Sequence, residues 1–139
     1  MASLWELIFG RRSQLPDGFA AARCRAEEVM LALNPNALVV IEQGLVCSIE
    51  DVRDPDGRLF RLEYQATGDA QHAIAWARHT PWPLDNAPHQ IGGLICIGVG
   101  GHGRDVAASP YTLSQVVPRA RFWCIAVSVY FETGTFPSP

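Results

Sequence analysis

The stretch LVCSIEDVRDPDGRLFRLEYQ, residues 45–65, decides the fold class because it has the pattern of two strands joined by a tight turn. Its middle, residues 54–57, is Asp-Pro-Asp-Gly, a combination of residue types that favours a turn. After the turn, Phe60, Leu62 and Tyr64 alternate with charged residues, which is typical of a strand with one buried face and one face in water. The stretch therefore predicts an antiparallel hairpin.

A helix and a further strand are expected before this hairpin. Residues 37–44, ALVVIEQG, form another short run rich in β-branched residues, which extends the hairpin to an antiparallel meander. The segment between the Pro-Asp-Gly of residues 16–18 and the Asn-Pro-Asn of residues 34–36 carries apolar residues at helical spacing. These residues are Phe19, Ala22, Ala26, Val29, Met30 and Leu33. We expect this helix to cover the apolar face of the sheet.

The segment after the meander gives a weaker signal. Residues 72–79, HAIAWARH, alternate large side chains with alanines, which fits a fourth strand or a short helical turn, and the strand is favoured. Residues 79–93, HTPWPLDNAPHQIGG, contain three prolines and two glycines, too many for regular structure. We expect them to form an extended, packed loop that leads to Cys96.

The carboxy-terminal part of the chain, SPYTLSQVVPRARFWCIAVSVYFETG at residues 109–134, predicts one long or broken helix. Ser109 is expected to cap it, with Pro110 in its first turn. Pro118 is expected to kink the helix or to begin a second segment. The β-branched residues within 125–130 leave a strand as the alternative there. The order of elements predicts an α+β domain: a helix, an antiparallel sheet, a loop with a cysteine, and a final helix.

Composition limits the function classes. The 139 residues fit one domain, and 18% charged with 48% hydrophobic residues is typical of a folded globular chain. A formal net charge of −3 gives no reason to expect binding to nucleic acid or to an anionic membrane. No apolar stretch approaches the roughly 20 residues that span a bilayer, and the first residues lack the pattern of a signal peptide. We expect a cytoplasmic protein with an N-terminal arm, residues 1–16, and a single domain, residues 17–139.

The four cysteines, Cys24, Cys47, Cys96 and Cys124, are scattered and form no CxxC pair. This spacing argues against a zinc site and against a disulfide framework, so we expect reduced thiols, no metal and no cofactor. Free cysteine is among the most buried residue types. From spacing alone, Cys96 is therefore predicted to be a core residue, as are Cys47 and Cys124.

Two motifs reverse that prediction for Cys96. APHQIGGLICIG, residues 87–98, resembles the active-site stretch of ubiquitin-conjugating (E2) enzymes, and SPYTLSQVV, residues 109–117, resembles the start of the helix that follows their cysteine. The short interval from histidine to cysteine is most similar to bacterial E2-like proteins encoded beside ubiquitin-like, E1-like and deubiquitinase-like partners in antiphage operons. The resemblance covers residues 17–132. It implies the α+β fold of E2 enzymes and a role in antiviral defence.

The resemblance implies a transferase that accepts a ubiquitin-like protein from an E1-like enzyme as a thioester on Cys96 and passes it to an amine of a target protein. His89 then has a structural role, in a His-Gln-Ile sequence that replaces the His-Pro-Asn of eukaryotic E2 enzymes. Gln90, Asn86 or the backbone N–H groups around Gly92 and Gly93 are the candidate donors for the oxyanion of the acyl transfer. Asp105 is the candidate carboxylate that deprotonates or orients the incoming amine.

Two other functions remain open from the sequence. One is a catalytically inactive E2-like module that binds a ubiquitin-like protein and does not need Cys96. The other is a cysteine hydrolase that uses Cys96 with His89 or His102 as its base, which requires an imidazole within hydrogen-bonding reach of the thiol.

Overall fold

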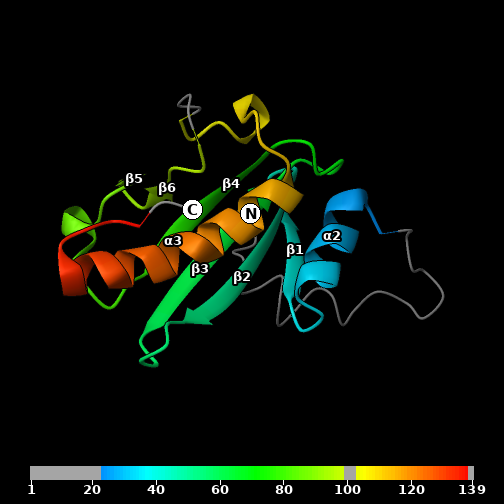
Figure 1. Cartoon of the computed structure of the whole chain (residues 1–139). Helices are drawn as coiled ribbons and strands as arrows, with labels where there is room; N and C mark the ends of the chain where they lie inside the picture. Colours follow the sequence, from blue (N-terminus) through cyan, green and yellow to red (C-terminus); the bar gives the residue numbers. More distant parts are fainter. Residues whose placement is uncertain (1–22, 99–102, 138–139) are drawn as a thin grey trace.

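A six-stranded antiparallel sheet forms the centre of the computed structural model, which describes residues 23–98 and 103–137 (Figure 1). The strand order across the sheet is β1-β2-β3-β4-β6-β5. The strands are β1 (Leu38–Glu42), β2 (Leu45–Arg53), β3 (Leu59–Ala66), β4 (Ala73–His79), β5 (Gln90–Ile91) and β6 (Leu94–Ile95). Together with the helices, this sheet confirms the predicted α+β class.

The hairpin predicted from the opening stretch is β2 and β3, which pair from Val46↔Ala66 to Arg53↔Leu59. Its turn is stabilised by Asp54, whose carboxylate accepts hydrogen bonds from the backbone N–H groups of Asp56 and Arg58. The predicted alternation is also confirmed, because every second residue of β3 is buried.

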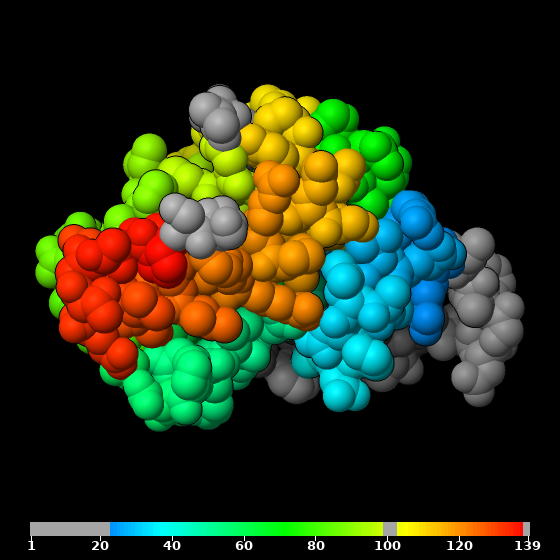
Figure 2. Space-filling model, viewed as in Figure 1, coloured from blue at the N-terminus to red at the C-terminus, as the bar shows by residue number. Residues whose placement is uncertain are grey.

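Two helices, α2 (Arg25–Leu33) and α3 (Leu113–Thr133), pack on one face of the sheet. Figure 1 shows α3 running across the strands and α2 beside β1, and Figure 2 shows the two helices in contact on the same side of the molecule. The predicted amino-terminal helix is confirmed from Arg25 onward. The predicted arm, residues 1–16, and the part of the predicted helix before residue 23 lie outside the described residues.

Residues 73–79 are a strand, as favoured, and not a helical turn. The register places Ala73, Ala75 and Ala77 on the helix side of the sheet, beside the large side chains of β3. Ile74 and Trp76 therefore point to the opposite face. The small alanines let α3 approach β4 closely, which explains why this strand alternates large and small residues.

The start of α3 differs from the prediction. Its N-cap is Thr112, which forms a capping box with Gln115, and the helix begins at Leu113. Ser109 caps nothing in α3, because it is buried and its hydroxyl donates to the carbonyl of Ala73 at 2.6 Å. A buried hydroxyl needs such a partner, so Ser109 fixes the preceding loop to β4 instead.

Pro118 lies inside α3, and the helix continues through it as one segment to Thr133. Of the two forms expected, the one long helix is confirmed: no second segment begins at Pro118, and the alternative strand at 125–130 is wrong. Proline removes one hydrogen bond, to the carbonyl four residues earlier. That residue, Ser114, and Pro118 both lie on the exposed side of the helix, where water can bind the carbonyl. Within the described residues, no helix is long and apolar enough to cross a membrane.

Candidate functional site

Cys96 follows a short hairpin that the sequence did not predict. Residues 79–93 were expected to lack regular structure, but Gln90–Ile91 and Leu94–Ile95 pair as β5 and β6. The two residues between them, Gly92 and Gly93, have positive φ values of 57° and 93°. Two consecutive residues with positive φ are what a tight two-residue hairpin turn requires, and glycine adopts them without strain. The glycine pair thus makes a turn here.

The alternation of β6 sets the direction of the Cys96 side chain. Ile95 and Ile97 are buried in the core cluster that contains both helices, so Cys96 between them points to the opposite face of the sheet. Its side chain is exposed. The backbone N–H of Cys96 donates to the carbonyl of His89 at 3.0 Å, which continues the hairpin by one pair.

The backbone that carries Cys96 is anchored on two sides. The N–H of Ala77 in β4 donates to the carbonyl of Gly93 at 2.7 Å, which joins the hairpin turn to the main sheet. The indole Nε1–H of Trp123 in α3 donates to the carbonyl of Pro88 at 2.9 Å. The thiol is therefore exposed on a segment that is hydrogen-bonded to both the sheet and the final helix.

Gln90, one candidate oxyanion donor, has its side-chain amide engaged within the loop. Its Nε2 donates to the carbonyls of Leu84 and Ala87 at 2.8 and 3.0 Å, and its Oε1 accepts from the N–H of Gly93 at 2.9 Å. Both amide protons are used by these bonds. In this structure Gln90 holds the 3₁₀ turn η3 (Leu84–Asn86) against the hairpin.

Asn86, the other candidate donor, is the last residue of η3 and is exposed. Among the described residues, no hydrogen bond is made by its side-chain amide, whereas its backbone N–H donates to the carbonyl of Pro83 at 3.2 Å. Of the two amides, Asn86 is the one with donors available to a substrate.

His89 has a left-handed backbone conformation, with φ of 58°, at the start of the hairpin. Its imidazole lies against the ring of Phe136, with ring centroids 4.5 Å apart. The hydrogen bond that joins His89 to Cys96 is made by the backbone. Within the described residues, no imidazole is hydrogen-bonded to the Cys96 thiol, and His102 lies outside them. The structure thus places His89 as a loop residue with no contact typical of a general base.

Asp105 is the N-cap of the short 3₁₀ turn η4 (Val106–Ala108), and its carboxylate accepts from the N–H of Ala107 at 3.1 Å. The next residue, Val106, is buried against Ile74 and Trp76. These residues mark the face of the sheet that also carries Cys96. Asp105 itself is exposed.

The other cysteines have different surroundings, and all four are free. Burial, with nearby glutamates, raises the pKa of Cys47 and of Cys124 to about 12. Both are core residues, as predicted. Cys24 is half-buried at the N-cap of α2. Within residues 23–98 and 103–137, no group of three or more His, Cys, Asp or Glu side chains is placed to hold a metal ion.

Two arginines border the cysteine segment, and the sequence did not single them out. The guanidinium of Arg104 lies 5.7 Å from the Trp76 ring centroid and next to Gly92 of the hairpin turn. Arg119 of α3 donates to the carbonyl of Ile97 at 3.4 Å. No local pattern marks these arginines, because long-range folding brings them to the hairpin. The segment that carries Cys96 thus has an arginine on each side of the sheet, Arg104 on the Trp76 face and Arg119 on the helix face.

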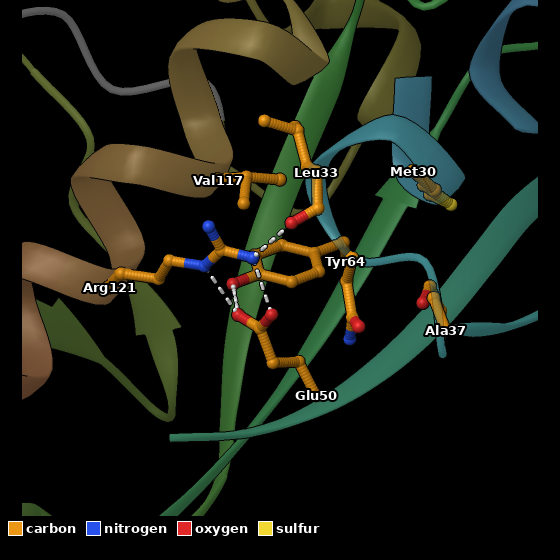
Figure 3. Close-up of a pocket in the computed structure, with 9 residues that line it drawn as sticks. Met30, Leu33, Ala37, Glu50, Tyr64, Val117 and Arg121 are labelled. Atoms are coloured by element: carbon orange, nitrogen blue, oxygen red, sulfur yellow. Dashed lines mark hydrogen bonds and ion pairs between the residues drawn. The ribbon is translucent and has the colours of Figure 1, made fainter. Parts of the chain in front are cut away.

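A small pocket lies elsewhere, between α2, α3 and the sheet (Figure 3). Its polar groups are used within the protein: the Glu50 carboxylate accepts from the Tyr64 hydroxyl at 2.8 Å and from Arg121 at 2.8 and 2.6 Å. Arg121 also donates to the carbonyl of Leu33 at 3.1 Å. The lining residues do not include the hairpin, and this network is structural.

No protein-family model, curated protein or solved structure matches this chain. The assignment of function therefore depends on the residues around Cys96.

Proposed function

We propose that the protein is an E2-like carrier that accepts a ubiquitin-like protein from an E1-like enzyme on Cys96 and transfers it to an amine of a target protein. The observation that carries the proposal is the position of Cys96: it is exposed, directly after a hairpin hydrogen-bonded to both β4 and α3. Cys47 and Cys124 are buried with raised pKa values, so neither can take this role.

The first step is an exchange of one thioester for another. The Cys96 thiolate attacks the thioester carbonyl of the loaded E1-like enzyme, the new S–C bond forms, and the E1 cysteine leaves as a thiolate. This exchange is nearly balanced in energy and needs no strong base, because cysteine is nucleophilic even when only a few per cent is ionised. An exposed thiol with no bonded imidazole is sufficient for it.

In the second step an amine attacks the thioester on Cys96, the C–N bond of an amide forms, the C–S bond breaks with the Cys96 thiolate leaving, and the amine loses a proton to water. Negative charge develops on the carbonyl oxygen, and an amide donor aimed at it is worth on the order of 10²–10³ in rate. Asn86 is the better candidate for this donor, because both amide protons of Gln90 are bonded within the loop. Asp105 is the candidate to orient the amine.

The order of elements also supports the proposal. A helix, an antiparallel sheet, a cysteine segment and a final helix follow each other as the resemblance to E2 enzymes implies. The same resemblance extends the proposal to a bacterial, cytoplasmic conjugation pathway with a role in antiviral defence.

The test is a loading reaction with ATP, an E1-like enzyme and the ubiquitin-like protein that this enzyme activates. Products of the wild type, Cys96→Ser and Cys96→Ala are separated with and without reductant. We expect a reductant-sensitive adduct in the wild type, a reductant-resistant ester in Cys96→Ser and no adduct in Cys96→Ala. Cys24→Ser is the matched control and should load like the wild type.

A different result selects another function. If the E1-like enzyme is charged but the wild type forms no adduct, the carrier proposal fails and the inactive binding module takes its place. Release of free ubiquitin-like protein from a conjugate, lost in Cys96→Ala, would instead indicate the cysteine hydrolase.

A further inference from the structure

Every strongly basic side chain in this sequence is an arginine: the chain has 11 Lys and Arg residues, and none of them is lysine. Part of this choice follows from geometry. Arg61 and Arg121 each bind a carboxylate through two nitrogens, a contact that the planar guanidinium makes and an ammonium does not.

Other arginines make contacts for which lysine would serve equally well. Arg25 is 67% exposed and reaches Glu28 through one nitrogen at 3.6 Å. Arg53 donates a single hydrogen bond to the carbonyl of Gly57 at 2.8 Å. Neither contact uses the fork of the guanidinium, so hydrogen-bond geometry does not explain why lysine is avoided.

The arginines that border Cys96 also make no two-nitrogen contact with a carboxylate; each guanidinium lies over an aromatic ring, Arg104 over Trp76 and Arg119 over Tyr111, and a lysine ammonium can make this contact too. Arg104 lies beside Gly92 at the tip of the hairpin, with its guanidinium facing the Trp76 ring. Arg119 makes one hydrogen bond, at 3.4 Å, to the carbonyl of Ile97, the residue after Cys96. Neither has a carboxylate within ion-pair distance among the described residues. Cys96 is three residues beyond the turn, about 10 Å at the rise of a strand.

The difference between the two cations matters next to a thioester. A lysine ammonium loses its proton readily enough to attack a carbonyl, whereas the arginine guanidinium stays protonated in proteins. A neighbouring amine would also have the advantage of proximity, which raises the effective concentration by several orders of magnitude. An amine beside Cys96 would therefore capture the acyl group before a target protein could.

We propose that Arg104 gives the Cys96 segment positive charge that cannot accept the acyl group, so that the thioester is preserved for an external amine. This inference rests on the proposed carrier function. The reaction that arginine prevents at this position is an S-to-N transfer: the thioester C–S bond breaks, an amide C–N bond forms, the amine loses a proton to water and Cys96 is released as a thiolate.

The experiment introduces an amine at position 104 and loads Cys96 chemically. Arg104→Lys is compared with Arg119→Lys and Arg25→Lys, all in a Cys24→Ser background that leaves Cys96 as the exposed thiol. The donor is a short peptide whose carboxy-terminal glycine is a mercaptoethanesulfonate thioester. Excess donor is removed, the proteins are held at pH 8, and the adduct is treated with hydroxylamine, which cleaves a thioester and leaves an amide. Intact mass and peptide mapping then locate the amide.

We expect the rate of amide formation to rise at least about tenfold in Arg104→Lys over the parent, over Arg119→Lys on the helix face and over Arg25→Lys. Arg25→Lys is the matched control because α2 lies at the opposite end of the molecule from β5 and β6 (Figure 1). Far-ultraviolet circular dichroism checks that each variant is folded.

Two outcomes overturn the inference, and one of them spares the carrier function. If the parent loads on Cys96 but Arg104→Lys forms an amide no faster than Arg25→Lys, arginine at this position does not protect the thioester and only this inference fails. If the parent does not load on Cys96, while a maleimide confirms a free thiol, the carrier function fails with it.

Discussion

The four cysteines differ in exposure, and the position of each residue within its strand, helix or loop decides whether its thiol is buried. Cys96 is exposed because its neighbours Ile95 and Ile97 take the buried positions of an alternating segment. Cys47 and Cys124 take buried positions themselves, and desolvation raises the pKa of each thiol to about 12. Thiol reactivity follows the thiolate fraction and the access of solvent to the sulfur. The exposed Cys96 is therefore expected to be the most reactive of the four thiols.

This difference in exposure predicts the pattern of thiol labelling. In the folded protein at pH 7.5, a maleimide should modify Cys96 within minutes, Cys24 more slowly, and Cys47 and Cys124 only on the timescale of unfolding. Mass spectrometry of digested samples over time measures each site. Cys96→Ser should remove the fast site alone, and the two buried sites should appear together in urea. Fast labelling of Cys47 or Cys124 in the folded state would contradict the assignment.

At the scale of single residues, the sequence predicts the candidate cysteine but not the roles of its neighbours. Cys96 follows from the resemblance of the surrounding motif, whereas its spacing alone predicts a core residue. Gln90 was a candidate donor because amides can bind an oxyanion, but a sequence does not show that Leu84 and Ala87 offer carbonyls to both its protons. These hydrogen bonds depend on the 3₁₀ turn η3, which forms only when the loop packs on β4.

At the scale of elements, the hairpin β5–β6 is the structure that holds the cysteine in place. It is short, and its position depends on the close approach of Gly93 to β4. The Gly93 carbonyl accepts from Ala77, and a Cβ at position 93 would lie 3.1 Å from the carbonyl oxygen of Ala77. A side chain there would be strained by its φ and by contact with the neighbouring strand.

Gly93 can be compared directly with Gly57, whose φ of 82° is similar but whose added Cβ would have no atom within 4 Å. Gly57→Ala should therefore cost about 1 kcal/mol of unfolding free energy, from φ alone. Gly93→Ala should cost about 2–3 kcal/mol because the hairpin must also move away from β4. Urea unfolding measures both. Gly93→Ala should in addition slow the loading of Cys96, whereas Gly57→Ala should not; equal costs would contradict this account.

The long elements were predictable, and the short ones were not. Alternation in β3 and helical spacing in α2 are strong local signals, and the structure confirms both. The sequence placed the cap of α3 at Ser109 instead of Thr112 because both are good capping residues followed by a helical pattern. Tertiary packing decides which of the two residues caps the helix. Ser109 is buried and bonded to the Ala73 carbonyl, and no local sequence pattern indicates this contact.

The turn between β2 and β3 is joined to α3 through Asp54, which gives stability a dependence on pH. Burial alone would raise the pKa of Asp54, but hydrogen bonds from Arg58 and Ser128 outweigh it and lower the pKa from 3.8 to about 2. The folded state therefore holds this proton less tightly than the unfolded state. The resulting stability, about 2 kcal/mol, is complete above about pH 5 and is lost as the pH falls through 4 to below 2.

Asp54→Asn should therefore lower the unfolding free energy by about 2 kcal/mol at pH 7, and the difference from the wild type should shrink between pH 4 and pH 2. Asp56→Asn is the matched control in the same turn; Asp56 is 63% exposed, so this change should cost less than about 1 kcal/mol. Urea unfolding at pH 7, 4 and 2.5 measures both. A difference that stays constant over this range would show that the charge of Asp54 does not stabilise the fold.

At the scale of the whole molecule, one polar network joins both helices to the sheet (Figure 3). Arg121 of α3 binds Glu50 of β2 through two nitrogens and also donates to the carbonyl of Leu33, the last residue of α2. Tyr64 of β3 donates to the same carboxylate. The Glu50 side chain is only 10% exposed, so its charge depends on these partners. The network fixes α2 to the rest of the domain.

The costs of removing the two partners should therefore not add up. Arg121→Met leaves the Glu50 carboxylate buried without its cation and should lower the unfolding free energy by about 3 kcal/mol. Glu50→Gln should cost about 1–2 kcal/mol, and the double variant should cost less than the sum of the two by at least about 1 kcal/mol. Arg25→Met, at an exposed position of α2, is the control and should change stability by less than about 0.5 kcal/mol. Hydrogen exchange adds a local readout: amides of α2 should exchange faster in Arg121→Met than those of β3, because the bond to Leu33 is lost. If the losses of unfolding free energy add up, and amides of α2 and β3 exchange at the same rate in Arg121→Met, then α2 is held by apolar packing alone.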